Sequence, residues 1–93
     1  MTEPQKHYKF IYKSWEYYFM KPVKSVEKDE VEFMDGTVET LRAELLSRLD
    51  GPAIIDIKNG NKFYCVNGKF LPFITNDKEL QFAIKLNKLK MFQ

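Results

Sequence analysis

The stretch from Tyr8 to Phe19, YKFIYKSWEYYF, constrains the fold of this chain more than any other feature. Seven of its twelve side chains are aromatic. Six of these occupy alternate positions on either side of Ser14: Tyr8, Phe10, Tyr12, Trp15, Tyr17 and Phe19. Aromatic enrichment with a period of two is typical of β-strands. The stretch therefore predicts one strand bent by a bulge near Ser14, or two short strands.

Turn signals divide the chain that follows into further hairpins. A strand pair is expected around Lys28-Asp29, ending at Asp35-Gly36. Asn59-Gly60 and Asn67-Gly68 each predict a two-residue turn, because Asn and Gly tolerate the positive φ angles that a type I′ turn requires. Two-residue loops would place Ile57 opposite Lys62 and Tyr64 opposite Leu71.

Two helices are expected. The first begins after Thr37 as N-cap and carries an apolar stripe as far as Leu49, with Gly51 as a left-handed C-cap before Pro52. The second is expected from Asp77 to Lys90, where Asn76 and Glu79 resemble a capping box. The alternation of apolar residues in this second segment also fits a strand.

Together these patterns predict a small α+β single domain of residues 1–93, with a curved antiparallel sheet of five or six strands, two Asn-Gly hairpins and two helices. Residues 1–6 are expected to be a disordered terminus. One sheet face would carry Phe63, Cys65 and Phe70, with the last helix covering it.

Composition indicates a globular chain. Apolar residues make up 44% and charged residues 30% of the sequence, and the net charge is +2. Cys65 is the single cysteine, which excludes an internal disulfide and fits a reducing compartment. Neither a signal peptide nor an apolar run of about 20 residues is present, so we expect a cytoplasmic protein with no membrane partner.

Catalytic signatures are weak. His7 is the only histidine and is expected in solvent near the N-terminus, while Cys65 is expected to be a buried, inert thiol. The carboxylates of residues 27–32 alternate with lysines, which favours a solvated hairpin face over a metal cage. We therefore predict no enzyme, no cofactor and no metal; a small hydrolase or nuclease built on this acidic hairpin is the weakest alternative.

The favoured hypothesis is a non-catalytic protein-binding module, since Tyr and Trp are enriched at the energetic centres of interfaces. Small size without catalytic motifs is typical of phage or mobile-element accessory proteins, so an inhibitor or adaptor of a larger host protein is the expected form. Apolar residues on both sheet faces also suggest a homodimer. The predicted partner-binding residues are Tyr8, Tyr12, Trp15, Tyr17, Tyr18, Phe82, Leu86 and Leu89.

The alternative hypothesis is nucleic-acid or nucleotide binding. Single-strand binders combine stacking aromatic rings with a basic groove. The lysines that would serve this role are Lys6, Lys9, Lys13 and Lys21. The modest net charge and the nearby glutamates make this reading less favoured than protein binding.

Overall fold

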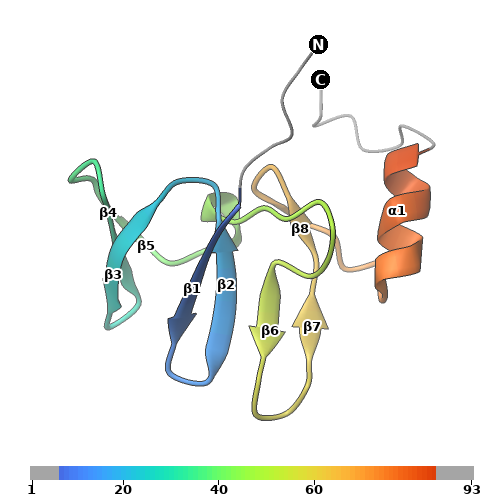
Figure 1. Ribbon diagram of the computed structural model, residues 1–93, viewed down its shortest axis with the longest axis horizontal. Helices are drawn as coiled ribbons and strands as arrows, with labels where there is room; N and C mark the ends of the chain where they lie inside the picture. Colours follow the sequence, from blue (N-terminus) through green and yellow to red (C-terminus); the bar gives the residue numbers. More distant parts are fainter. Residues whose placement is uncertain (1–6, 86–93) are drawn as a thin grey trace.

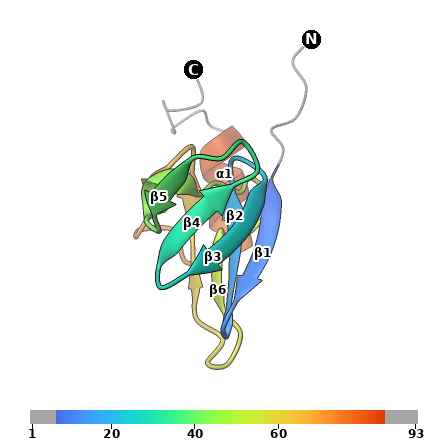
Figure 2. The same ribbon diagram turned by 90° about the vertical axis from the view of Figure 1, so that its left-hand side faces the viewer.

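The computed structural model describes residues 7–85 and is built mainly of antiparallel strands (Figures 1 and 2). A four-stranded sheet has the order β1-β2-β6-β7, a three-stranded sheet the order β3-β4-β5, and β8 and β9 form a small third sheet. The strands are β1 (Tyr8–Tyr12), β2 (Trp15–Phe19), β3 (Val23–Glu27), β4 (Glu30–Phe33), β5 (Val38–Thr40), β6 (Ile54–Asp56), β7 (Lys62–Phe63), β8 (Cys65–Val66) and β9 (Lys69–Phe70). These elements support the α+β class. The prediction of a single sheet of five or six strands was wrong, because the strands form three separate sheets.

The aromatic stretch forms a hairpin. β1 and β2 pair antiparallel, from Tyr8 opposite Phe19 to Tyr12 opposite Trp15. Lys13 has a φ of 58° in the two-residue turn. The alternative of two short strands was therefore the correct one. The next hairpin, β3–β4, turns at Lys28-Asp29 as predicted.

The prediction of a first helix from Thr37 to Leu49 was wrong. This segment instead forms β5 and a short 3₁₀ helix, η1 (Ala43–Leu45). The cause lies in the preceding turn, where Gly36 has a φ of 92° and the Asp35 carboxylate accepts hydrogen bonds from the N–H and hydroxyl of Thr37. This turn reverses the chain, so that Val38 and Glu39 pair with β4 and the helix cannot start. Gly51 also lacks the left-handed conformation expected of a helix C-cap.

The two Asn-Gly pairs behave differently. Asn67 and Gly68 form a two-residue turn with φ angles of 51° and 81°, as predicted, and the Leu71 N–H donates to the Tyr64 carbonyl. At Asn59-Gly60 the predicted register was wrong, because Ile55 and not Ile57 lies opposite Lys62. The Asp56 carboxylate accepts hydrogen bonds from the main-chain and side-chain nitrogens of Asn59 and so holds a wider loop.

One α-helix lies in the described part of the chain, α1 (Asp77–Lys85). Asn76 caps it by accepting a hydrogen bond from the Glu79 N–H, and the Glu79 carboxylate accepts one from the Thr75 N–H. The second predicted helix is therefore confirmed from Asp77 to Lys85. Its expected continuation to Lys90 lies outside the described residues.

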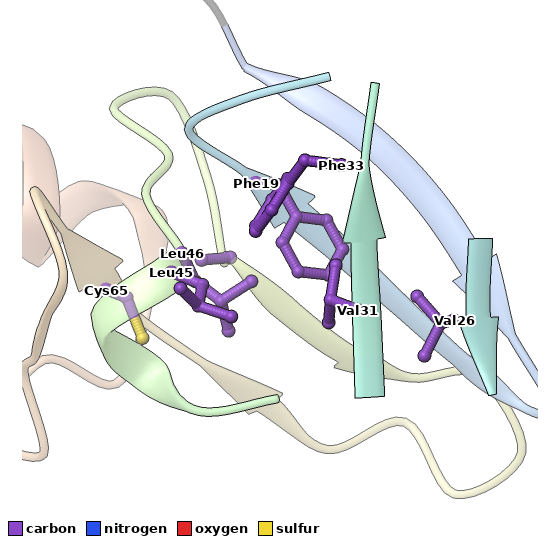
Figure 3. Close-up of a cluster of buried hydrophobic side chains, with 8 residues drawn as sticks. Phe19, Val26, Val31, Phe33, Leu45, Leu46 and Cys65 are labelled. Atoms are coloured by element: carbon purple, nitrogen blue, oxygen red, sulfur yellow. The ribbon is translucent and has the colours of Figure 1, made fainter. Parts of the chain in front are cut away.

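Buried side chains form two clusters. The first joins both larger sheets and η1 and contains Phe19, Val26, Val31, Phe33, Leu45, Leu46, Ala53 and Cys65. Figure 3 shows Phe19 and Phe33 against one another, with their ring planes at 83° and ring centroids 6.2 Å apart. The second lies under α1 and contains Tyr64, Val66, Leu71, Ile74, Leu80 and Ala83.

Two expectations about single side chains have different outcomes. Cys65 is buried, as predicted, and burial raises the pKa of its thiol to about 11. His7 was wrongly expected in solvent: its ring is partly buried and accepts a hydrogen bond from the Leu49 N–H. Burial lowers the pKa of His7, against the opposing effect of the nearby Asp50 carboxylate.

Candidate protein-binding groove

Strand pairing gathers the aromatic side chains on one face of the four-stranded sheet. Residues directly opposite each other in an antiparallel pair point to the same side. The register therefore puts on one face Tyr8, Phe10, Tyr12, Trp15, Tyr17, Phe19, Ile54, Asp56 and Phe63. The other face carries Lys9, Glu16 and Tyr18 from the first hairpin. We call the first of these the aromatic face.

The three-stranded sheet and η1 cover one half of the aromatic face. Figure 2 shows β3 and β4 lying in front of β1 and β2. Phe19 is fully buried, and Tyr8 and Phe10 pack against the same cluster. This half is ordinary hydrophobic core.

The other half of the aromatic face is open. A groove of about 440 Å³ lies over β2, β6 and β7 and is bounded by η1 and β9. Its lining residues are Trp15, Tyr17, Leu41, Arg42, Ala43, Leu46, Ile54, Phe63 and Phe70. We call this the Trp15 groove. Eight of these nine residues are apolar or aromatic, so the groove offers a hydrophobic surface that no described element fills.

Four aromatic rings form a row along the groove. Trp15 lies between Tyr17 and Phe63, with centroid distances of 6.5 Å on each side and interplanar angles of 18° and 27°. Phe63 continues the row to Phe70, at 6.2 Å. Contacts of this kind fix the orientation of each ring. The groove wall is thus preorganised.

The Asn67-Gly68 turn sets the outer wall. The Gly68 N–H donates to the Leu46 carbonyl, which draws the β8–β9 hairpin against η1. A Cβ atom at Gly68 would lie 2.7 Å from the Glu44 carbonyl oxygen, so only glycine permits this approach. β9 is thereby held beside the groove, and Phe70 forms its rim with 48% of its surface exposed.

Among residues 7–85, Arg42 is the only charged residue that lines the Trp15 groove. Its guanidinium binds the Glu39 carboxylate at 3.2 Å and the Glu44 carboxylate at 2.9 Å. These carboxylates also line an adjoining hollow of about 250 Å³, which Arg42 shares with the groove. Arg42 therefore stands at one end of the groove, between two carboxylates.

A second hollow adjoins the groove at its other end. It measures about 240 Å³, and its lining includes Lys62, Phe63, Phe70, Pro72 and Thr75. Phe63 and Phe70 line both depressions, so the two meet at this pair of rings. The accessible surface is longer than the Trp15 groove alone.

The predicted partner-binding residues are spread over several surfaces. Trp15 and Tyr17 line the groove, whereas Tyr8 and Tyr12 are partly buried beside the first cluster. Tyr18 lies on the opposite face, where its ring contacts the Arg48 guanidinium and its hydroxyl donates to Glu16. Phe82 is 63% exposed on α1. Leu86 and Leu89 lie outside the described residues.

Of the lysines proposed for nucleic-acid binding, Lys9, Lys13 and Lys21 do not line the groove. Lys9 pairs with Glu16 at 3.7 Å, and Lys21 pairs with Asp35 at 3.2 Å. The ammonium groups of Lys13 and Lys21 lie over the rings of Tyr12 and Phe33. Lys6 lies outside the described residues.

Of the nine residues that line the groove, the sequence analysis predicted Trp15 and Tyr17 only, and the aromatic residues that it missed are Phe63 and Phe70. It placed both under the last helix, and this was wrong, because α1 packs on Tyr64, Val66 and Leu71 instead. Period-two alternation did separate Phe63 and Phe70, on one face, from Tyr64, Val66 and Leu71 on the other. The sequence pattern did not show which of these two faces α1 would cover.

Other candidate chemistry is sparse in the described chain. Among residues 7–85, no group of three or more His, Cys, Asp and Glu side chains is arranged to hold a metal ion. In the acidic hairpin, Glu32 pairs with Lys24. Burial raises the pKa of Tyr17, with the Asp29 carboxylate adding to the effect.

Comparison of the chain with protein-family models, with curated proteins and with solved structures finds no match. In the part of the chain that the structure describes, no helix has the length and apolar character to cross a membrane.

Proposed function

We propose that this chain is a non-catalytic protein-binding module and that its contact surface is the Trp15 groove. The observation that carries the proposal is the open half of the aromatic face, where Trp15, Phe63 and Phe70 line one hydrophobic hollow. A cluster of aromatic side chains with a preformed shape is typical of the energetic centre of a protein interface.

The rigidity of the groove favours binding. The ring contacts along the row from Tyr17 to Phe70 already restrict these side chains. Binding therefore costs less conformational entropy than it would on a flexible surface. Arg42, which is paired with the Glu39 and Glu44 carboxylates, adds a polar group at one end of the groove.

An inhibitor or adaptor that acts on a larger protein is the form of this function that we favour. Homodimer formation stays a separate prediction, which light scattering tests.

The proposal is tested by affinity capture from a lysate of the cells that make the protein. Wild-type chain is compared with Phe70→Ala in the groove and with Phe73→Ala, a matched control whose ring is 65% exposed and does not line the groove. We expect a captured protein whose recovery falls at least about tenfold with Phe70→Ala and is unchanged with Phe73→Ala. Equal recovery by all three chains would exclude the groove as the contact surface.

A further inference from the structure

We propose that His7 is a pH-sensitive latch: its neutral imidazole fastens the start of β1 to the loop of residues 46–53, which joins η1 to β6, and its protonated imidazole releases that loop. His7 is the only histidine in the sequence and does not line the Trp15 groove, so this inference is independent of the proposed function. Three observations carry it: the hydrogen bond that the ring accepts, the charges around the ring and the support of the loop by other contacts.

The hydrogen bond of the ring joins distant parts of the chain. His7 directly precedes β1, and its Nε2 accepts a hydrogen bond from the Leu49 N–H in the loop at 3.2 Å. Only 15% of the His7 side chain is exposed. The Leu49 carbonyl accepts a second hydrogen bond, from the Gln81 side chain of α1 at 2.7 Å. Leu49 therefore links the start of β1 to α1.

The direction of this hydrogen bond fixes the protonation state of the ring. Nε2 is the acceptor, so the neutral ring carries its proton on Nδ1, which lies 4.0 Å from the Asp50 carboxylate. An imidazolium donates from both nitrogens and has no acceptor left. Protonation would set an N–H of the ring against the Leu49 N–H, and the bond between His7 and the loop would be lost.

The charges around the ring do not compensate for this loss. Among residues 7–85, Asp50 and Arg48 are the charged groups that act on the ring, and α1 meets the loop with the uncharged Gln81. The Asp50 carboxylate favours the imidazolium, but it is exposed and already binds the Arg48 guanidinium at 2.8 Å. Burial of the ring, with repulsion from Arg48, therefore holds the pKa of His7 below its ordinary value of 6.5.

The sign of the pH effect follows from this lowered pKa. The unfolded chain takes up the proton at a higher pH than the folded chain does. The stabilising contribution of the neutral ring is therefore complete above pH 6.5 and is lost as the pH falls below that value.

Other contacts keep the loop in place when the latch opens. The N–H groups of Ser47 and Arg48 donate to carbonyls of β2 and β8. The Arg48 guanidinium also donates to the Pro52 carbonyl. The part that moves on protonation is therefore the end of β1 that carries His7, and not the loop.

Nuclear magnetic resonance of the full chain tests the latch without any substitution. The ring protons of His7 and the amide of Leu49 are followed from about pH 8 to about pH 5, the range in which histidine changes its charge. We expect a His7 midpoint below 6.5 and a Leu49 amide resonance that shifts with the same midpoint. The Gly68 amide, which donates to the Leu46 carbonyl, is the control and should not follow the ring. A Leu49 amide that does not follow the ring, or a His7 midpoint at or above 6.5, would overturn the proposal.

Two variants separate protonation from loss of the side chain. His7→Gln supplies an amide oxygen that can accept the Leu49 N–H and does not titrate, whereas His7→Ala supplies no acceptor at any pH. From about pH 7 to about pH 5, the melting temperature of the wild type should fall by a few degrees more than that of His7→Gln. His7→Ala should melt below the wild type at about pH 7, with the gap closing as the pH falls. A parallel fall in the wild type and His7→Gln, or a gap to His7→Ala that does not change with pH, would show that His7 is not a latch.

Discussion

The two halves of the aromatic face have the same chemistry and different surroundings. On β2, Phe19 and Trp15 point to the same side of the same strand. Phe19 is fully buried beneath the three-stranded sheet, whereas Trp15 is only partly buried and lines an open groove. The difference arises from the covering layer, which reaches one half of the face and leaves the other.

This comparison shows how a binding surface can arise without any special residue type. The covered half needs large apolar side chains for stability, and the same alternation continues along the strand into the open half. There the aromatic residues contribute less to folding and remain available for contact. The two halves should therefore respond differently to truncation.

The largest expected difference comes from Phe19→Ala compared with Trp15→Ala. Removing the fully buried Phe19 ring should cost about 3–5 kcal/mol of unfolding free energy, since it leaves a cavity against Phe33. Trp15→Ala should cost about 1–2 kcal/mol, because its ring is already partly in water. Urea denaturation measures both. Equal losses would mean that the open half belongs to the core.

A smaller effect is expected at the turn that builds the groove wall. Gly68→Ala places a Cβ atom at a position with positive φ and brings it against the Glu44 carbonyl. We therefore expect a loss of about 2–3 kcal/mol of unfolding free energy. Gly60→Ala is the matched control: its φ is 80°, but nothing lies within 4 Å of a Cβ there, so about 1 kcal/mol is expected.

Partner binding separates this effect from simple destabilisation. Gly68→Ala should also move β9 from η1 and lower the recovery of any partner that Phe70→Ala releases, as measured by affinity capture with chains that are still folded. Equal stability of the Gly68→Ala and Gly60→Ala variants would show that the β8–β9 hairpin is not held against η1.

The sequence predicted most of the strands other than β5, and α1, because their signals are local. Period-two aromatic alternation, positive-φ turn residues and the Asn76 cap each act within a few residues. The helix prediction for residues 37–49 failed because the structure of this segment is set by contacts with other parts of the chain. Its apolar spacing fits a helix, yet Leu45, Leu46 and Ser47 are buried in succession, which one helical stripe does not allow. Pairing with β4 overrides the local preference.

The Asn59 turn shows how a single side chain changes a register. Asn-Gly favours a two-residue loop, but the Asp56 carboxylate binds Asn59 and lengthens the loop. Aspartate three residues before a turn was the available signal. The groove was only partly predictable: Trp15 and Tyr17 came from the aromatic pattern, while Phe63 and Phe70 depend on which face α1 covers.

The smallest expected effect tests what keeps the cover over one half of the face. The Asp35 carboxylate binds Thr37 and lies 3.2 Å from the Lys21 ammonium, which together lower its pKa from 3.8 to about 2. A lowered folded-state pKa means that this carboxylate stabilises the fold above pH 3.8, and that the contribution is lost as the pH falls through about 2. Asp35→Ala should therefore lower the melting temperature by a few degrees at neutral pH, with the difference from wild type shrinking as the pH falls from 3.8 towards 2.

Thermal unfolding followed by circular dichroism, on both chains over this pH range, measures the difference. Because both chains carry all the other titratable groups, the difference between their melting temperatures at each pH reports the contribution of Asp35. Glu27→Ala is the control, because Glu27 is exposed on β3 and makes no ion pair with the described residues. A difference that persists undiminished at pH 2 would show that the charge of Asp35 is not what stabilises the β4–β5 turn. The hydrogen bonds from Thr37 to the Asp35 side chain, together with the reversal of the chain at Gly36, would then explain why residues 38–40 form a covering strand without any contribution from the charge.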